Sequence, residues 1–260
     1  MTITVLIDNT AGGKLIAEHG LSYLIEHDGH KILFDTGHSG AFFKNAQSME
    51  IDIQKDIETI VLSHGHWDHG DGLRFIEGQT LLTHPDSFIK RYREKDHSYI
   101  GLNLSKDEIE KKFKLITSHN PYYITSKIIF MGGIPRKNDF EAQSTTFVDE
   151  KGNKDFVPDD SAMALIQNNE LMVISGCAHS GICNIIEYAK KVSGLNKVKL
   201  VIGGFHLKYY DIQTEKTIEY IKNQKIEHIY PSHCTELPAL TAFYHHFHFL
   251  QVKTGMIFKF

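Results

Sequence analysis

The sequence predicts an α+β fold in which two β-sheets pack face to face and helices cover their outer faces, a four-layer αββα sandwich. Short apolar runs rich in β-branched residues, typical of strands, occur in both halves of the chain, and each half also carries helical patterns. With 260 residues, 41% of them hydrophobic, the chain can fill one large core, so we expect a single domain over residues 1–260.

The first half opens with β-structure. Strands are predicted at residues 2–7, 21–26, 31–34, 59–62 and 80–83. A turn at residues 27–30 joins the second of these strands to the third. A helix is predicted at residues 39–49, where apolar spacing follows a serine. The strand at residues 59–62 is wholly apolar, which is typical of an internal strand in a covered sheet.

The second half repeats this pattern. Strands are predicted at residues 161–167, 171–175, 197–202 and 226–230, and helices at residues 183–191 and 214–223. The dipeptide Asn168-Asn169 separates the first two of these strands, as in a hairpin. Residues from about 85 to 155 are charged and lie between core strands, so we interpret them as an insertion that forms a lid over the site.

The strand at residues 59–62 leads directly into Ser-His-Gly-His-Trp-Asp-His-Gly at residues 63–70, which we call the metal loop. Its metal-competent side chains are His64, His66, Asp68 and His69. The first two histidines can reach one ion, while the aspartate and the third histidine point onward to a second. A lone histidine is more often structural than a ligand, and the chain has 17 of them. Four candidate ligands within six positions nevertheless favour a site for two metal ions.

Three later strands supply further imidazoles. The predicted strands at 171–175, 197–202 and 226–230 are each followed within a few residues by a histidine, respectively His179, His206 and His233. Glycines near two of these strand ends let the backbone approach an ion closely. We expect these histidines to complete the metal site, although a loop histidine can also occur by chance, most readily at His206.

Composition limits the function classes. A net charge of −4 argues against a nonspecific nucleic-acid binder, because binding to phosphate backbones normally needs a basic surface. No apolar stretch is long enough to span a membrane, and the N-terminus does not resemble a signal peptide, so we expect a cytoplasmic protein that does not bind membranes. The three cysteines, Cys177, Cys183 and Cys234, are an odd number without Cys-x-x-Cys spacing and are expected to be thiols.

Two weaker features are given structural interpretations. The acidic pair Asp159-Asp160 is interpreted as solvated loop residues. Residues 245–249 alternate histidine with phenylalanine, which favours an aromatic-rich strand or an oligomer contact over metal binding. The apolar C-terminal stretch could pack on the protein's own core or on a second copy, so a homo-oligomer remains an open alternative.

The motifs resemble those of the metallo-β-lactamase superfamily, from Phe34-Asp35-Thr36-Gly37 through the His-x-His-x-Asp-His loop to the last strand-end histidine. The motif sequences Gly-Cys-Ala-His-Ser-Gly, Gly-Gly-Phe-His-Leu and Pro-Ser-His-Cys are similar to the branch containing the archaeal 7,8-dihydropterin-6-methyl-4-(β-D-ribofuranosyl)aminobenzene-5'-phosphate synthase. Because the loop carries His66 and not Glu, it resembles the zinc-type branch rather than the diiron flavoproteins.

The resemblance implies two divalent metal ions, with zinc favoured and manganese or iron as alternatives. The ligands that it implies are His64, His66 and His179 for the first ion, and Asp68, His69 and His233 for the second. Asp35, in the turn before the metal loop, is expected to support the ligands without binding metal itself.

The chain departs from the family at one position. The superfamily usually bridges its metals with an aspartate between the third motif and the last histidine, where this chain has His206, and the only aspartate in that interval is Asp211. His206 is therefore a candidate for substrate contact or for a weaker second metal site, and we assign Asp68 and His206 as the candidate catalytic residues. Lys208 is a candidate phosphate-binding residue from its position near His206.

Three functions follow as hypotheses. The first is a binuclear enzyme acting on a phosphorylated small molecule, with transfer and loss of diphosphate as in the pterin synthase branch. The second is a metal-dependent hydrolase of a phosphoester, lactone or thioester, which would use the same ligands. The third is a metal-dependent protein that binds a metabolite without turnover.

Overall fold

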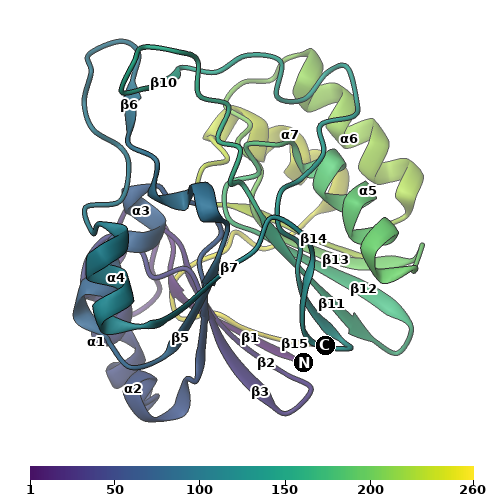
Figure 1. Ribbon diagram of the computed structural model, residues 1–260. Coiled ribbons are helices and arrows are strands. Elements are labelled where there is room, and N and C mark those ends of the chain that lie inside the picture. Colours follow the sequence, from purple (N-terminus) through teal and green to yellow (C-terminus); the bar gives the residue numbers. More distant parts are fainter. The chain divides into compact units, whose positions relative to one another are not determined.

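The computed structural model describes residues 1–260 and divides them into two compact units. Unit 1 comprises residues 1–119, 145–155 and 253–260, and unit 2 comprises residues 120–144 and 156–252. Each unit has one large mixed sheet, with most strands labelled in Figure 1, and a hydrophobic cluster of its own.

The sheet of unit 1 has the strand order β15-β1-β2-β3-β4-β5-β7. Its strands are β1 (Thr2–Ile7), β2 (Ser22–His27), β3 (His30–Phe34), β4 (Thr59–Val61), β5 (Thr80–Thr83), β7 (Lys114–Thr117) and β15 (Ile257–Lys259). Pairing is antiparallel from β15 to β3 and parallel from β3 to β7. The carboxyl ends of four parallel strands therefore meet at one edge, where loops of open α/β sheets commonly bind ligands.

Helices and a small ribbon complete unit 1. They are α1 (Ala41–Ser48), α2 (Ile53–Asp56), α3 (Trp67–Gly70), α4 (Lys106–Lys112), the 3-10 turns η1 (Asp71–Phe75) and η2 (Pro85–Phe88), and the antiparallel pair β6 (Arg91–Arg93) and β10 (Phe147–Asp149). Phe42 and Ala46 of α1 are buried in one cluster with Leu33 and Leu62, so α1 packs on the sheet. The metal loop thus starts from a strand anchored in this core.

The sheet of unit 2 has the strand order β14-β13-β12-β11-β9-β8. Its strands are β8 (Tyr122–Thr125), β9 (Ile128–Phe130), β11 (Ala162–Gln167), β12 (Glu170–Ser175), β13 (Val198–Gly204) and β14 (His228–Ser232), and its helices are α5 (Ile182–Ser193), α6 (Ile212–Gln224) and α7 (Leu237–Phe247). Strands β12, β13 and β14 are parallel. Three carboxyl ends, each followed by a histidine, therefore lie next to one another.

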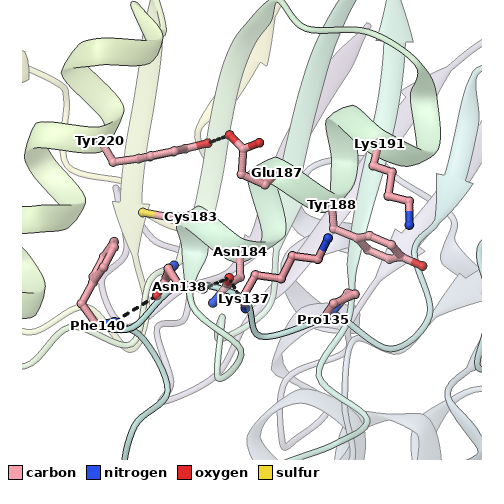
Figure 2. A pocket seen from close by; sticks show the side chains of 10 residues that line it. All are labelled: Pro135, Lys137, Asn138, Phe140, Cys183, Asn184, Glu187, Tyr188, Lys191 and Tyr220. Atoms are coloured by element: carbon pink, nitrogen blue, oxygen red, sulfur yellow. Dashed lines mark hydrogen bonds between the residues drawn. The ribbon is translucent and has the colours of Figure 1, made fainter.

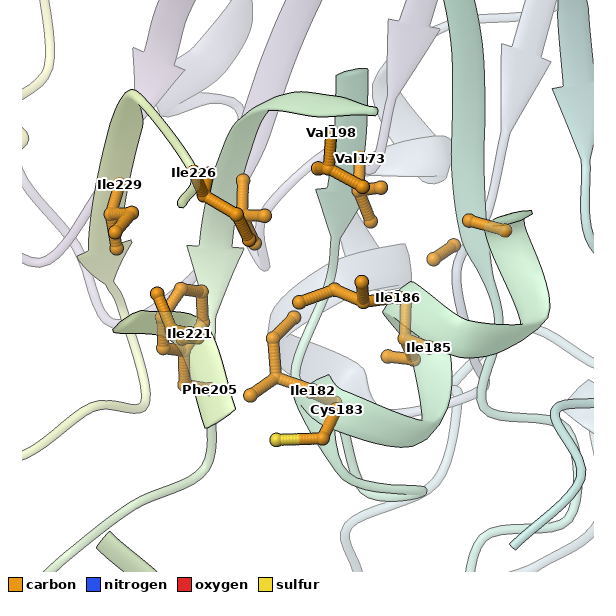
Figure 3. Packing of buried hydrophobic residues seen from close by; sticks show 14 of the residues in the cluster. Val173, Ile182, Cys183, Ile185, Ile186, Val198, Phe205, Ile221, Ile226 and Ile229 are labelled. Carbon is orange, nitrogen blue, oxygen red and sulfur yellow. The ribbon is translucent and has the colours of Figure 1, made fainter. Parts of the chain in front are cut away.

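Helix α5 covers the sheet of unit 2 with an isoleucine face. Figure 3 shows Ile185 and Ile186 projecting from α5 into the cluster that contains Val173 of β12 and Val198 of β13. Full burial of one such side chain contributes roughly 1.5–3 kcal/mol. The helix ends at Gly194, whose φ of 72° is the left-handed conformation common after a helix.

Both hairpins predicted from the sequence are present. Each uses a two-residue loop with positive φ at both positions, Asp28-Gly29 with 50° and 78° and Asn168-Asn169 with 54° and 59°. Such loops match the twist of the flanking strands, and Asn, Asp and Gly tolerate the left-handed conformation best. The other predicted strands and helices are confirmed with ends shifted by a few residues.

The C-terminal histidine and phenylalanine segment is not a strand, so this alternative of the prediction is wrong, while an oligomer contact there stays a prediction. Residues up to Phe247 continue helix α7, and His248 follows as its left-handed cap. Ala239 and Phe243, one helical turn apart, are the buried residues of this helix, and Pro238 lies in its first turn, a position that proline favours. The helical spacing of these buried residues outweighs the local alternation of histidine and phenylalanine, so the segment continues the helix.

Strands β7, β8 and β9 lie within the region interpreted as an insertion, and they belong to the two main sheets. The role of residues 85–155 as a lid and the single-domain organisation stay predictions. None of the helices is long and apolar enough to cross a membrane.

Candidate metal centre

The metal loop of unit 1 buries its four candidate ligands together. His64, His66, Asp68 and His69 are each at most 7% exposed. His64 Nε2 lies 3.0 Å from His66 Nδ1, and the ring centroids of His64 and His69 are 4.3 Å apart. Asp68 Oδ2 lies 3.9 Å from His69 Nε2. Imidazole nitrogens and a carboxylate in this proximity are a donor set that zinc accepts, so the residues fit a metal ion.

Asp35 holds this loop by three hydrogen bonds. Its carboxylate accepts from the backbone N–H of Ser63, from Ser63 Oγ and from His69 Nδ1, each at 2.7 Å. Asp35 itself lies just after β3, is fully buried and has a left-handed φ of 57°. A buried network of this kind fixes the loop in one conformation, as expected for a residue that supports metal ligands.

The same network selects the tautomers of two histidines. Since the Ser63 hydroxyl donates to Asp35, it accepts from His64 Nδ1, which lies 2.9 Å away. His69 Nδ1 likewise donates to Asp35. In the neutral form, each ring then has its lone pair on Nε2, and this nitrogen could bind a metal ion. The sequence analysis did not identify Ser63, although its place directly before the first ligand was a possible indication.

Burial and neighbouring charges keep His64 neutral. Burial lowers the pKa of His64 well below its ordinary value of 6.5, and the nearby His69 and His66 lower it further, whereas Asp68 acts in the opposite direction. A histidine binds metal in its neutral form. His64 is therefore ready to act as a ligand at neutral pH without losing a proton.

Gly65 lets the loop pass close to a neighbouring backbone. A Cβ atom at this position would lie 1.8 Å from the carbonyl oxygen of Ser87, in η2. No side chain fits there unless the backbone moves. The glycine between His64 and His66 is therefore required by packing within unit 1.

His19 joins the loop and was missed by the sequence analysis. Its Nε2 lies 3.2 Å from Asp68 Oδ2, and its side chain is 52% exposed. Its ring also lies 5.8 Å from the ring of Trp67, while His38 lies 4.9 Å from the same indole. Nothing in the sequence around His19 forms a motif, because the residue reaches the loop only through the fold.

Unit 2 brings two of its strand-end histidines together and places the third at the end of a neighbouring strand. The rings of His179 and His206 are 4.3 Å apart, and His233 follows the adjacent strand β14 and is 6% exposed. His206 and His233 have left-handed φ values of 52° and 49°. Strained conformations of this kind persist where the surrounding structure enforces them, often at functional sites. The predicted convergence of the strand ends is present within this unit.

Asp160 holds the His179 loop much as Asp35 holds the first. It accepts from the backbone N–H of Ser180 at 2.8 Å and from Ser180 Oγ at 2.6 Å. Burial raises the pKa of Asp160, although these hydrogen bonds act against the rise. The interpretation of Asp159 and Asp160 as solvated is therefore wrong, because both are fully buried.

Two further features lie outside the predicted ligands. Lys208, proposed as a phosphate contact, is exposed, and its substrate role stays a prediction. A pocket of about 410 Å³ lies beside α5 (Figure 2), with Phe140, Tyr188 and Tyr220 among its lining residues and the amine of Lys191 at its edge. Sequence reasoning missed this pocket because a loop and two helices distant in sequence form it.

A second histidine pair in unit 1 has a structural explanation. His84 Nε2 lies 2.9 Å from His119 Nδ1, after β5 and β7 respectively. His84 Nδ1 accepts from the backbone N–H of Asp86 and so caps η2. This capping bond fixes the His84 ring, so we assign no catalytic role to the pair.

Comparison with known proteins gives consistent matches. Residues 15–80 match the metallo-beta-lactamase superfamily. An uncharacterized protein of Methanocaldococcus jannaschii is 38% identical and covers 92% of each chain. A second protein of that organism, 7,8-dihydropterin-6-methyl-4-(beta-D-ribofuranosyl)-aminobenzene-5'-phosphate synthase, is 32% identical over 94% of this chain and 90% of its own length.

A solved structure extends the match to three dimensions. It is described as a metal-dependent hydrolase of the beta-lactamase superfamily and aligns over 100% of this chain and 99% of its own, with a TM-score of 0.89 and 27% identity. This alignment confirms the αββα fold class predicted from the sequence. The ligand sets expected from the resemblance draw on both units and stay predictions.

Proposed function

The chain belongs to the metallo-β-lactamase superfamily, and on that premise we propose that this metal-dependent enzyme acts on a phosphorylated small molecule by transfer with loss of diphosphate. The observation that carries the proposal is the buried loop in which hydrogen bonds to Ser63 and Asp35 fix the rings of His64 and His69 as candidate ligands. The 32% identity to the pterin synthase over nearly the whole chain supports the choice of reaction.

Residues of both units would hold the ions. The proposal assigns His64, His66 and His179 to one ion, and a second set to the other, consisting of Asp68, His69 and His233. Bound divalent ions would stabilise the negative charge of a departing diphosphate. Asp35 and Asp160 would keep the ligand loops in place while the reaction proceeds, because each accepts hydrogen bonds from its own loop.

Charge supports an anionic substrate. Asp68 is the only anionic protein ligand in the proposed set, so two divalent ions keep a net positive charge in the site. The chain as a whole has a net charge of −4, which does not attract polyanions over its surface. Attraction of a phosphorylated substrate is therefore local to the ligands, with His206 and Lys208 as the candidate substrate contacts.

Hydrolysis of a phosphoester, lactone or thioester is the second candidate, supported by the 27% identical structure described as a metal-dependent hydrolase. In hydrolysis, water would take the place of the amine acceptor at the same ligands. A metabolite-binding protein without turnover is the third candidate, and it would share the same ligand loops.

One experiment separates these functions. Zinc- or manganese-loaded protein is incubated with the dihydropterin diphosphate, with and without the aminobenzene ribosyl phosphate, and diphosphate release is followed. Release that needs the amine acceptor supports the transferase, release without it supports the hydrolase, and tight binding with intact ligand supports the third candidate. His66→Ala should abolish release, whereas His245→Ala, an exposed histidine of α7, serves as the matched control.

A further inference from the structure

Two cysteines and a histidine converge at the ends of three adjacent strands in unit 2. Cys177 follows β12, His206 follows β13 and Cys234 follows β14. The two sulfur atoms and a ring nitrogen of the histidine all lie within 4.8 Å of one another. Cys177 is buried, and the other two are partly buried. Three soft or borderline donors therefore meet in one partly buried place.

The backbone around these donors is shaped to admit the sulfur of Cys234. A Cβ atom at Gly204 would lie 2.6 Å from Cys234 Sγ and 2.5 Å from the carbonyl oxygen of Gly176. The Cys234 thiol also donates to the carbonyl oxygen of Cys177 at 3.5 Å, which orients it toward β12. The absence of a side chain at Gly204 thus creates the space that this sulfur occupies.

We propose that Cys177, Cys234 and His206 form a thiolate-containing site for a soft metal ion, with zinc as the natural occupant. A tetrahedral zinc ion lies about 2.3 Å from each sulfur and about 2.0–2.1 Å from an imidazole nitrogen, which places its ligand atoms within about 4 Å of one another. The donors here are within 4.8 Å, so small side-chain movements complete the set. Each thiol releases its proton to solvent as it binds.

This site differs from the proposed centre in its chemistry. Thiolates select zinc, copper(I) and cadmium over magnesium and manganese, whereas the metal loop of unit 1 offers only nitrogen and oxygen donors. His206, which stands where the superfamily usually has an aspartate, is then a ligand of this soft site in place of a substrate contact, which leaves Lys208 as the candidate substrate contact. Three protein ligands leave a fourth coordination position for water or another small ligand. The inference does not depend on the proposed function.

The test is a cadmium titration of the reduced full-length protein. Binding is monitored through the sulfur-to-cadmium charge-transfer absorption band in the ultraviolet. The wild type should show this band, and Cys177→Ser and Cys234→Ser should each remove more than half of it. Cys183→Ser is the matched control, a buried thiol of α5, and should keep the full band. His206→Ala should weaken cadmium affinity at this site by more than about tenfold, since loss of even a residue that only supports a ligand lowers metal affinity by about ten- to a hundredfold.

Cadmium-113 NMR of the unaltered protein keeps the test decisive if a variant does not fold. A resonance in the range of sulfur coordination supports the site, and resonances of nitrogen and oxygen coordination alone overturn it. A band that disappears only in Cys183→Ser also overturns it. If the thiolate band is present but no substrate turns over, the proposed function fails and this inference stands. If substrate turns over but no thiolate band is seen, this inference fails and the proposed function stands.

Discussion

Two buried aspartates, Asp35 and Asp160, organise the candidate site at the scale of single residues. Each accepts a backbone N–H and a hydroxyl from the serine next to a predicted ligand, Ser63 in unit 1 and Ser180 in unit 2. Neither aspartate is assigned as a ligand. The sequence placed Asp35 in its supporting role through a motif, but it gave no motif for Asp160, whose partners become apparent only in the folded chain.

Asp35→Asn should weaken metal binding more than it changes the fold. The amide keeps the shape of the side chain but loses the charge and one acceptor, so it cannot accept from Ser63 and His69 as before. We expect metal affinity to fall by about 10- to 100-fold and unfolding free energy to fall by about 1–3 kcal/mol. Calorimetric titration with zinc and urea unfolding measure these changes.

Asp139→Asn is the control for this change, because the Asp139 side chain is 90% exposed. It should leave both quantities unchanged. Wild-type zinc affinity in Asp35→Asn would show that the hydrogen bonds of Asp35 do not position the ligands.

Glu141 should make the stability of unit 2 depend on pH. Burial raises its pKa from the ordinary 4.5, although hydrogen bonds from the backbone N–H groups of Cys183 and Asn184 act against the rise. The folded state then binds the proton more tightly than the unfolded state. The unfolding free energy should therefore fall as pH rises from about 4.5 through the raised folded pKa.

Denaturant unfolding across this pH window tests the prediction. Glu141→Gln is expected to reduce the fall, and Asp160, whose pKa burial also raises, keeps the rest of it. Glu187 of α5 gives the opposite sign. Despite partial burial, its hydrogen bonds with Lys190 and Tyr220 lower its pKa, so its contribution is present above the ordinary pKa and lost as pH falls through the lowered folded value. If the wild type instead gains stability relative to Glu141→Gln as pH rises, the pKa of Glu141 is not raised in the folded state and the prediction is wrong.

At the scale of elements, α5 connects the core of unit 2 to the His179 loop that precedes it. Ile185→Ala removes a fully buried side chain from this helix and should lower the unfolding free energy by about 2–5 kcal/mol. Ile212→Ala on α6 is the matched control, because Ile212 is 69% exposed, and should change it by less than about 0.5 kcal/mol. Urea unfolding of both variants measures the difference, and equal losses would show that α5 is not anchored by this face.

Elements also show which parts of the fold are predictable from sequence. The hairpin at Asn168-Asn169 follows from local chemistry, since these residues tolerate the left-handed turn that joins two apolar runs. The end of α7 does not follow from local chemistry. Residues 245–249 alternate as a strand would, but the buried contacts of Ala239 and Phe243 extend the helix to Phe247. Tertiary packing overrides the local pattern there.

At the scale of the whole molecule, the proposed ligands extend from residue 64 to residue 233 and belong to both units. The strand-end histidines could be found from sequence because each follows an apolar run closely. His19 could not, since its contact with Asp68 joins two loops without a shared pattern. Motifs therefore predict ligands that follow strands, while contacts made by irregular loops appear only with the fold.

If the ligands come from both units as proposed, metal binding stabilises the whole chain. A ligand that binds only the folded state at 100 times its dissociation constant adds about 2.7 kcal/mol of stability. Removal of metal by a chelator should therefore lower the thermal unfolding midpoint, and added zinc should restore it.

If the ions are held as proposed, His64→Ala in unit 1 and His233→Ala in unit 2 should each lose much of the zinc-dependent gain, whereas His245→Ala should keep it. Elemental analysis should give two ions per chain in the wild type, or three if the thiolate site is also filled, and fewer in both ligand variants. A gain that disappears with His64→Ala but persists in full with His233→Ala would restrict the stabilising metal to unit 1 and contradict the shared assignment.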